Sequence, residues 1–389
     1  MKSPAAWVLL AVSAGLAGYV LLLYPLLLQL LAVASRRRRG VRGATDRYRP
    51  SITILVPVHN EEDNIGRKLE ALLEIEYPRD LTQVLVVSDA SSDGTDAIVQ
   101  TYAARGVELV RLPRRGGKTA AENAALPFIR TELVVNTDAS VGIHPDAIAR
   151  LVAPLADPEV GVTSSHNVSV SGRDGDVVHA EGWYNRWDMH VRRLESEICG
   201  IVGASGALFA CRRDIHAVAV PDTLSRDFAT PLIAKELGYR SVLVPDAICT
   251  VRRSTSLRAE YRRKVRTMAR GIRTLGHKKH LLNPLRFGAF AWVLLSHKVG
   301  RWLIPPVVVV ALAGTGIAVA GGRVTMVLGG LAVVAVGCGA VGWWWPRGRM
   351  MPRGMAAISY LVLGTLAGCH AWVRAFEGNQ EAIWEPTRR

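Results

Sequence analysis

The stretch "VVNTDASVGIHPDAI", residues 134–148, places an acidic side chain where an apolar run ends. Asp138 follows residues typical of a buried strand, and Pro145-Asp146 starts a segment with the pattern of a helix. A carboxylate at such a position can bind a metal ion, accept a proton or cap the turn that follows. The next side-chain oxygen is the hydroxyl of Ser140, so this segment offers few ligands for a metal ion. The residues alone leave the three roles open.

Polar residues also follow two other apolar runs in this part of the chain. The run 52–58, "ITILVPV", is followed by His59, Asn60 and Glu61, and the run 83–88 is followed by Asp89. In a parallel sheet the carboxyl ends of the strands share one edge, where ligands bind. We therefore expect these side chains and Asp138 to converge on one site.

The elements that would position these residues alternate along the chain. The apolar runs predict strands over 52–58, 83–89, 107–112 and 132–138, with helical patterns over 65–76, 97–106 and 118–129 between them. This alternation predicts an α/β domain with a parallel sheet and crossover helices. No GxGxxG motif follows the first strand and no GxxxxGK[ST] motif occurs, which argues against a dinucleotide oxidoreductase and a P-loop kinase.

Apolar residues are concentrated at the two ends of the chain, which is 49% hydrophobic over 389 residues. Residues 5–34 are almost continuously apolar, whereas about 20 residues suffice to cross a bilayer. We expect a retained membrane helix there. The alternative is a cleaved signal peptide, but its apolar region would be only ~7–15 residues long. The Arg-rich segment "SRRRRGVRG" that follows predicts that the chain continues in the cytosol.

The C-terminal part predicts about three further membrane helices within 301–376, over 302–320, 324–345 and 355–376, before a polar tail over 377–389. Between the cytosolic domain, 50–250, and these helices, residues 251–300 predict amphipathic helices at the membrane surface. In particular, 285–300 is too short for an ordinary span and is expected to lie in the interface. Residues 257–275 place apolar residues on one helix face and arginines on another, as in a helix lying on anionic lipid.

The net charge of +15 fits a cytosolic domain that lies against an anionic membrane leaflet, so membrane lipids are expected partners. Nucleic acid is not an expected partner, because no basic recognition module interleaved with aromatic residues is found. The five cysteines form no CxxC motif and are expected to be packing residues.

The motifs "VPVHNEE", "VVSDASSDGT", "RRGGKTAAENAAL", "NTDAS" and "GASGALFACRRD…LSRDFATPL" resemble membrane-bound family 2 glycosyltransferases of the GT-A fold. They occur in the family's order over roughly residues 50–275. The segments "SHKVGRW" and "WEPTRR" look like those of polysaccharide-synthase-like members. The resemblance implies a nucleotide sugar donor, a Mg²⁺ or Mn²⁺ ion and an integral membrane enzyme.

On the donor side, the resemblance implies that Asp89 accepts a hydrogen bond from the base and that Pro57, His59 and Glu61 frame the nucleoside. It also implies that Lys118, with Asn123 on the next helical turn, lies near the donor. Asp89 could instead cap the turn "SSDGT", and Gly116-Gly117 before Lys118 could be a plain loop.

The family usually has Asp-x-Asp where this chain has Asp138 and Ser140. Asp138 is then the implied metal ligand and Ser140 a weak one. Because Mg²⁺ often takes one or two carboxylates together with substrate phosphates, we expect the donor diphosphate to hold most of the metal's coordination sphere. Metal binding without nucleotide should then be poor.

On the acceptor side, the resemblance implies that Asp227 is the general base, and a helix N-cap is its alternative role. Arg226 replaces the first acid of the family's pair, and we expect it to favour ionised Asp227. Gly206 would line the acceptor cleft. The weaker candidates are Trp183, for sugar stacking or packing, and Arg266 or Arg270, for the diphosphate, since the family's Gln-x-x-Arg-Trp motif is absent.

The leading interpretation is a metal-dependent, inverting glycosyltransferase in the cell membrane. It would move a sugar from a UDP-sugar, or from a GDP-sugar, to a saccharide or lipid-linked acceptor at the cytoplasmic face, as in polysaccharide synthesis. The alternatives are transfer to a polyprenyl phosphate and a non-catalytic membrane scaffold that binds sugar nucleotides. A transporter has little support, because the apolar segments contain few ionisable residues.

Overall fold

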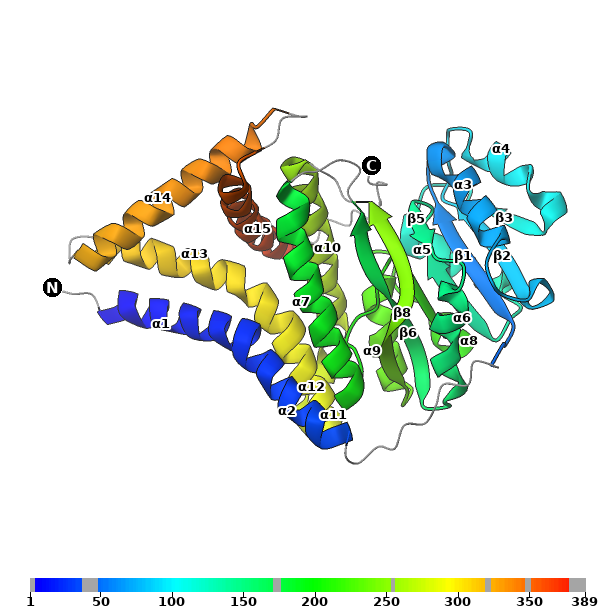
Figure 1. Cartoon of the computed structure of the whole chain (residues 1–389), viewed down its shortest axis with the longest axis horizontal. Coiled ribbons are helices and arrows are strands. Elements are labelled where there is room, and N and C mark those ends of the chain that lie inside the picture. Colours follow the sequence, from blue (N-terminus) through cyan, green and yellow to red (C-terminus); the bar gives the residue numbers. More distant parts are fainter. Residues whose placement is uncertain are drawn as a thin grey trace.

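A computed structural model describes residues 4–36, 48–170, 176–252, 256–318, 323–346 and 351–377. Its centre is one eight-stranded sheet with the strand order β3-β2-β1-β4-β7-β6-β8-β5 (Figure 1). The strands are β1 (Ile52–Val58), β2 (Thr82–Ser88), β3 (Val107–Arg111), β4 (Leu133–Thr137), β5 (Val141–Ile143), β6 (Val160–Val170), β7 (Leu208–Arg212) and β8 (Arg240–Arg252).

The half of the sheet formed by β3, β2, β1 and β4 is parallel, as the sequence predicts. All seven residues of β1 are buried, because helices cover both faces of this half. On one face Ile54 and Val56 pack with α3 (Glu62–Leu73), and on the other Leu55 packs with α5 (Lys118–Ala124). A third helix, α4 (Thr95–Gln100), follows β2. The carboxyl ends of β1, β2 and β4 therefore meet at one edge, as expected.

The other half of the sheet is mixed, which the sequence did not predict. Strand β7 is antiparallel to both β4 and β6, β8 is parallel to β6, and β5 is antiparallel to β8. The pairing of Thr137 with Leu208 brings the loop before β7 beside the end of β4. The short helices α6 (Ala147–Val152) and α8 (Arg213–Ala217) and the longer α9 (Arg226–Glu236) belong to this half.

Two long helices, α7 (Asp176–Ile198) and α10 (Leu257–His277), lie between the sheet and the remaining helices (Figure 1). The remaining helical elements are α1 (Pro4–Gly18), π-helical η1 (Tyr19–Leu23), α2 (Tyr24–Arg36), α11 (Pro284–Phe287), α12 (Ala289–Leu294), π-helical η7 (Leu295–Gly300), α13 (Arg301–Ala318), α14 (Arg323–Trp343) and α15 (Arg353–Phe376). Short 3₁₀ turns connect several of the elements.

Within the described residues, three helices are long and apolar enough to cross a membrane: Trp7–Ala34, Ala289–Gly314 and Arg353–Phe376. The second differs from expectation, because residues 289–300 run directly into α13 instead of forming a separate surface helix. In α14 the apolar stretch Gly329–Trp343 is shorter. The polar tail predicted over 377–389 lies outside the described residues except for Glu377.

Helix α10 forms as predicted, beginning after Ser256, whose hydroxyl accepts a hydrogen bond from the backbone N–H of Ala259. One side packs against the membrane helices, where the Tyr261 ring meets the Trp343 ring edge-on at 5.4 Å. The arginines of the other side line a cavity in the α/β domain. The arginine face of this helix, which the sequence predicts to contact lipid, is therefore turned largely toward the protein.

A cluster of polar and charged side chains, here called the membrane junction, joins α7 to the apolar helices and consists of Tyr24, Asp188, Glu195, His297 and Arg301. Tyr24, Glu195 and His297 are buried, whereas Asp188 and Arg301 are 15% and 21% exposed. Glu195 Oε1 lies 2.7 Å from the Tyr24 hydroxyl, which donates to it, and 2.6 Å from His297 Nδ1. Asp188 Oδ1 accepts from Arg301 Nη1 at 2.5 Å and lies 3.1 Å from His297 Nε2. The junction thus ties α2, α7 and the η7–α13 segment together through charged groups.

Candidate active site

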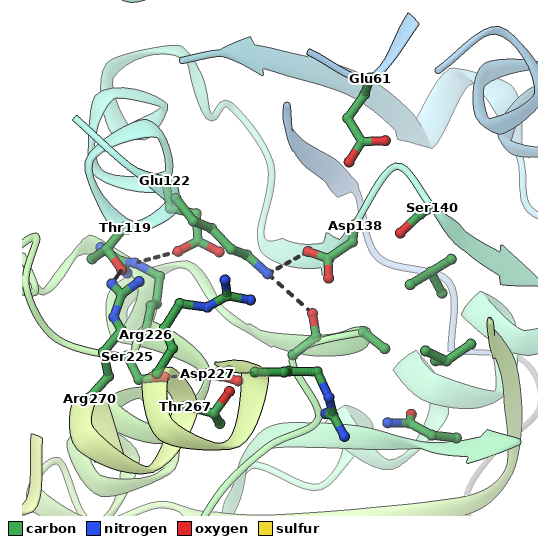
Figure 2. Close-up of a pocket in the computed structure, with 18 residues that line it drawn as sticks. Glu61, Thr119, Glu122, Asp138, Ser140, Ser225, Arg226, Asp227, Thr267 and Arg270 are labelled. Atoms are coloured by element: carbon green, nitrogen blue, oxygen red, sulfur yellow. Dashed lines mark hydrogen bonds and ion pairs between the residues drawn. The ribbon is translucent and has the colours of Figure 1, made fainter. Parts of the chain in front are cut away.

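A cavity of about 260 Å³ opens at the carboxyl ends of β1 and β4 (Figure 2). It is walled by α5 on one side and by the first turn of α9 and the side of α10 on the other. Its charged lining residues carry both signs: Glu61, Glu122, Asp138 and Asp227 are acidic, and Lys118, Arg226, Arg263, Arg266 and Arg270 are basic. The structure therefore brings together most of the site residues that the sequence predicts.

Asp138 lies in the turn after β4 and forms an ion pair with Lys118, whose Nζ is 2.5 Å from Asp138 Oδ1. The same ammonium donates to the backbone carbonyl of Gly206 at 3.2 Å. Because Gly206 belongs to the loop before β7, this one side chain links the predicted donor and acceptor sides.

The turn that carries Asp138 is held in place by hydrogen bonds from the side chain of Lys68 in α3. Its ammonium is almost fully buried and donates to Thr137 Oγ1 at 2.9 Å and to the Val141 carbonyl at 2.8 Å. These two acceptors flank the segment Asp138-Ala139-Ser140. Burial lowers the pKa of Lys68 to about 7, because both direct partners are neutral. The sequence pattern did not single out this lysine.

A divalent ion could draw only a small ligand set from this cavity. Among the described residues no group of three histidine, cysteine or acidic side chains could hold a metal ion. Asp138 supplies a carboxylate and Ser140, which also lines the cavity, a hydroxyl. Such oxygen ligands suit Mg²⁺ or Mn²⁺ when substrate phosphates complete the coordination, so the residues fit a metal that enters together with a nucleotide.

Asp89 is buried and does not line the cavity. Its two carboxylate oxygens accept hydrogen bonds from the backbone N–H groups of Gly116 and Gly117, at 2.7 and 2.8 Å. Gly117 has a φ of 90°, a conformation that glycine adopts without a steric cost. Asp89 therefore holds the loop that leads to Lys118, and the backbone N–H groups that could have met a phosphate are already bonded. Its contact with a base stays a prediction.

The other predicted nucleoside residues cluster beside Asp89. Pro57 is a buried residue of β1, and His59 Nδ1 lies 2.7 Å from the Asp89 carbonyl oxygen. Glu61 lines the cavity and accepts a hydrogen bond from Asn64 Nδ2 at 2.8 Å. Of these four residues Glu61 alone lines the cavity, and the roles of all four stay predictions.

Asp227 lies in the first turn of α9, across the cavity from Asp138. Its Oδ1 accepts hydrogen bonds from the Ser225 hydroxyl and from the Phe228 backbone N–H. Its Oδ2 faces Gly206 so closely that a Cβ there would lie 2.6 Å from it. Oδ1 is therefore bonded within the first turn of α9, whose N-cap is Ser225, while Oδ2 faces the loop that carries Gly206. The role of Asp227 as a general base stays a prediction.

Arg226 points away from Asp227, contrary to the sequence-based expectation that it lies beside that carboxylate. Its guanidinium is buried and donates to the His216 carbonyl at 3.0 Å and to Asn123 Oδ1. Its Nε lies 3.8 Å from Glu122 Oε2. Asn123 is therefore engaged with the α9 side of the cavity rather than presented to a donor.

Glu122 is a buried acid of the cavity that sequence reasoning missed. Burial raises the pKa of its carboxyl, while Lys118 and Arg226 oppose that shift. Its spacing of four residues from Lys118 in the helical segment was the available signal, since such pairs share one helix face.

The arginines of α10 differ in how they are engaged. Arg270 donates from Nη2 to the Leu224 carbonyl at 2.6 Å and to the Asp222 carbonyl at 3.0 Å, so it holds the loop before Asp227. Arg263 pairs with Glu260 at 2.7 Å, and Arg266 lines the cavity. The side chain of Trp183 lies outside the described residues.

Comparison with known proteins agrees with this geometry. Residues 53–218 match the model of the family described as Glycosyl transferase family 2. The chain is 26% identical over 286 residues to an N-acetylglucosaminyltransferase of Rhizobium meliloti, covering 68% of this chain and 65% of that protein. It is 32% identical over 117 residues to a beta-monoglucosyldiacylglycerol synthase of Synechocystis, covering 29% of this chain and 24% of that protein.

Among solved structures, a mannosyltransferase of Pyrobaculum calidifontis in complex with GDP-Man and Mn²⁺ is similar over 95% of this chain and 100% of its own, with a TM-score of 0.71 and 25% identity. The similarity thus extends beyond the α/β domain into the helices at both ends. The chain carries a family 2 glycosyltransferase domain with the GT-A fold, joined to helices that are candidates for membrane spans.

Proposed function

We propose that this protein is an inverting glycosyltransferase that moves a sugar from a UDP-sugar or GDP-sugar to a hydroxyl of a saccharide or lipid-linked acceptor. The observation that carries the proposal is the position of Lys118-Asp138 and of Asp227 on opposite walls of one cavity. A donor diphosphate suits the first wall, and a hydroxyl to be deprotonated suits the second.

On the donor side, Pro57, His59, Glu61 and Asp89 would surround the nucleoside, and Lys118 would meet the diphosphate. Asp138, with a weaker contribution from Ser140, would hold a Mg²⁺ or Mn²⁺ ion, whose chemistry is to neutralise charge on the departing diphosphate. The ammonium of Lys118 and the guanidinium of Arg266 add positive charge to the same cavity, where it stabilises the leaving group.

On the acceptor side, Asp227 Oδ2 would accept the proton of the attacking hydroxyl. The oxygen of that hydroxyl forms a bond to the anomeric carbon as the bond from this carbon to the diphosphate oxygen breaks, so the configuration is inverted. Gly206 leaves room for this carboxylate oxygen, since any side chain would collide with it. A general base is of use to a hydroxyl acceptor but not to a phosphate, which already carries negative charge. The position of Asp227 therefore favours hydroxyl acceptors over polyprenyl phosphates.

The helices around the domain support a reaction at a membrane surface. Three described helices are long enough to cross a bilayer, and the Arg-rich segment after the first favours a cytosolic catalytic domain. Among similar proteins, a beta-monoglucosyldiacylglycerol synthase supports a lipid acceptor, and an N-acetylglucosaminyltransferase supports transfer of a sugar. We therefore place transfer at the cytoplasmic face of the cell membrane, in the synthesis of a polysaccharide or glycolipid.

The proposal is tested with the full-length protein purified in detergent and supplied with a panel of UDP- and GDP-sugars, saccharides and lipid extracts. Mass spectrometry should detect a product that is one sugar heavier than its acceptor. Asp227→Asn should lower the rate of product formation by roughly 10²–10⁴-fold, whereas Asp246→Asn, at an exposed aspartate on β8, should not lower it. If wild type and Asp227→Asn are equally inactive while nucleoside diphosphate still binds, the protein is a sugar-nucleotide-binding scaffold.

A further inference from the structure

We propose that Lys118 occupies the metal-binding oxygen of Asp138 in the donor-free protein, and that the donor diphosphate draws this ammonium away so that metal and donor bind together. Lys118 would thus be a positioning residue that makes metal affinity conditional on the donor. This inference rests on the proposed function, because it requires a diphosphate in the cavity.

The contact itself is the first support. Lys118 Nζ lies 2.5 Å from Asp138 Oδ1, and the two side chains are 18% and 24% exposed, so the pair is reachable from the cavity but largely shielded from water. A charged hydrogen bond in such surroundings is stronger than one at the surface. A cation approaching the same oxygen must displace the ammonium or share the carboxylate with it.

The second support is that the rest of the site has little freedom to adapt. Lys68 bonds to groups on both sides of the turn that carries Asp138, and Asp89 holds both glycines that precede Lys118. The backbone on each side of the ion pair is therefore fixed. The element free to move is the flexible four-carbon stem of Lys118.

The third support is the balance of charge near the metal position. Ser140 brings no charge, so Asp138 is the single carboxylate in its turn, and the ammonium of Lys68 is buried below it. A divalent ion placed there without a ligand of its own is repelled by the ammonium of Lys118. A diphosphate supplies negative oxygens both to Lys118 and to the metal, which offsets this electrostatic repulsion.

Mn²⁺ alone is the probe for this coupling, with UDP or GDP as the diphosphate. Binding of Mn²⁺ to the full-length protein is measured by the decrease of the free-ion EPR signal, without and with nucleoside diphosphate. We expect the diphosphate to raise Mn²⁺ affinity by a factor in the range of ~5–150, typical of coupled sites. Lys118→Met should raise the affinity of the donor-free protein for Mn²⁺ by about tenfold and weaken binding of the diphosphate.

Two controls assign the effect to this ion pair. Arg263→Met removes one positive charge from the same cavity at a residue that pairs with Glu260, and should change metal affinity much less than Lys118→Met. Asp138→Asn should abolish the gain that Lys118→Met produces. Lys118→Gln provides a second variant if the methionine variant is unstable to heating.

The proposal is overturned if Lys118→Met and Lys118→Gln, both folded, bind Mn²⁺ no more tightly than wild type. It is also overturned if wild type binds Mn²⁺ equally well with and without the diphosphate. In either case the proposed transferase activity stands, provided that the diphosphate binds. If neither UDP nor GDP binds to the wild-type protein, the donor site itself is refuted.

Discussion

The cavity and the membrane junction are built from the same kinds of side chain, yet they are built differently. At the junction, Glu195 and His297 are almost completely buried, and each carboxylate meets its partners at short distances. In the cavity, Lys118 and Asp138 remain partly exposed beside about 260 Å³ of open space. The difference shows that buried charges alone do not identify a ligand-binding site. Charges that face an open volume can exchange partners with a ligand, whereas charges that enclose one another hold elements in place.

The largest expected effect on the cavity comes from Asp227→Asn. General base catalysis contributes roughly 10²–10⁴-fold, so kcat should fall by about that factor while donor affinity stays near the wild-type value. Steady-state kinetics with a hydroxyl acceptor, together with calorimetric binding of the nucleotide, measures both quantities. A fall in donor affinity as large as that in kcat would mean that Asp227 supports the donor side instead.

At the junction, the corresponding substitution is Asp188→Ala. Burial raises the pKa of the Asp188 carboxyl, but the nearby Arg192 and His297 lower it more. The pKa therefore lies well below its usual range, and the carboxylate is ionised. Its removal leaves Arg192 and Arg301 without this partner and should cost ~3–5 kcal/mol of stability. Denaturant unfolding in detergent gives that loss. The affinity of the folded variant for nucleotide should be unchanged. A loss of this affinity together with the loss of stability would show that the junction and the cavity do not act independently.

A smaller effect in the cavity is expected from Gly206→Ala. The new Cβ would lie 2.6 Å from Asp227 Oδ2, so the carboxylate must move away from its position. A displacement of about 1 Å can cost on the order of 100-fold in rate. Gly276→Ala on α10 is the matched control, because a Cβ there meets nothing within 4 Å. Equal rates for the two variants would show that the position of Oδ2 is not important for transfer.

The smallest effect concerns Lys68, whose pKa falls from 10.5 to about 7 on folding. Between these values the unfolded chain binds more protons than the folded one, so this group makes stability rise with pH from about 7 to about 10.5. The slope is at most ~1.4 kcal/mol per pH unit. Unfolding of wild type and Lys68→Met across this range should show the slope in wild type and its loss in the variant. Identical slopes would mean that folding does not lower the pKa of Lys68, so that its side chain stays a protonated ammonium across this range.

The parallel half of the sheet could be predicted because its strands are continuous apolar runs and its helices have clear periodicity. The shared direction of those strands explains why Glu61 and Asp138 line one cavity, whereas His59 and Asp89 do not line it and are bonded to each other. The resemblance to a known family supplied Asp227, which no local pattern marks. The mixed half was not predicted, because the pairing of β7 with β4 depends on contacts between residues about 70 positions apart.

Side-chain partners were the least predictable part of the site. The position of Arg226 next to Asp227 in sequence suggested an interaction, but neighbours on a helix point in different directions, and the guanidinium meets Glu122 of another helix. Lys68 looked like an ordinary polar position of an amphipathic helix. Its burial depends on the turn after β4, which passes over α3 only in the folded chain.

Helix α10 determines whether the α/β domain can be separated from the apolar helices. Its arginines line the catalytic cavity, while its opposite side packs on α14 and α15, as in the contact between Tyr261 and Trp343. A domain cut free of the terminal helices would expose that opposite side to water. It would also lose the support that keeps Arg270 on the loop before Asp227. The α/β domain and the apolar helices therefore share α10, and we expect the smallest active unit to include the helices.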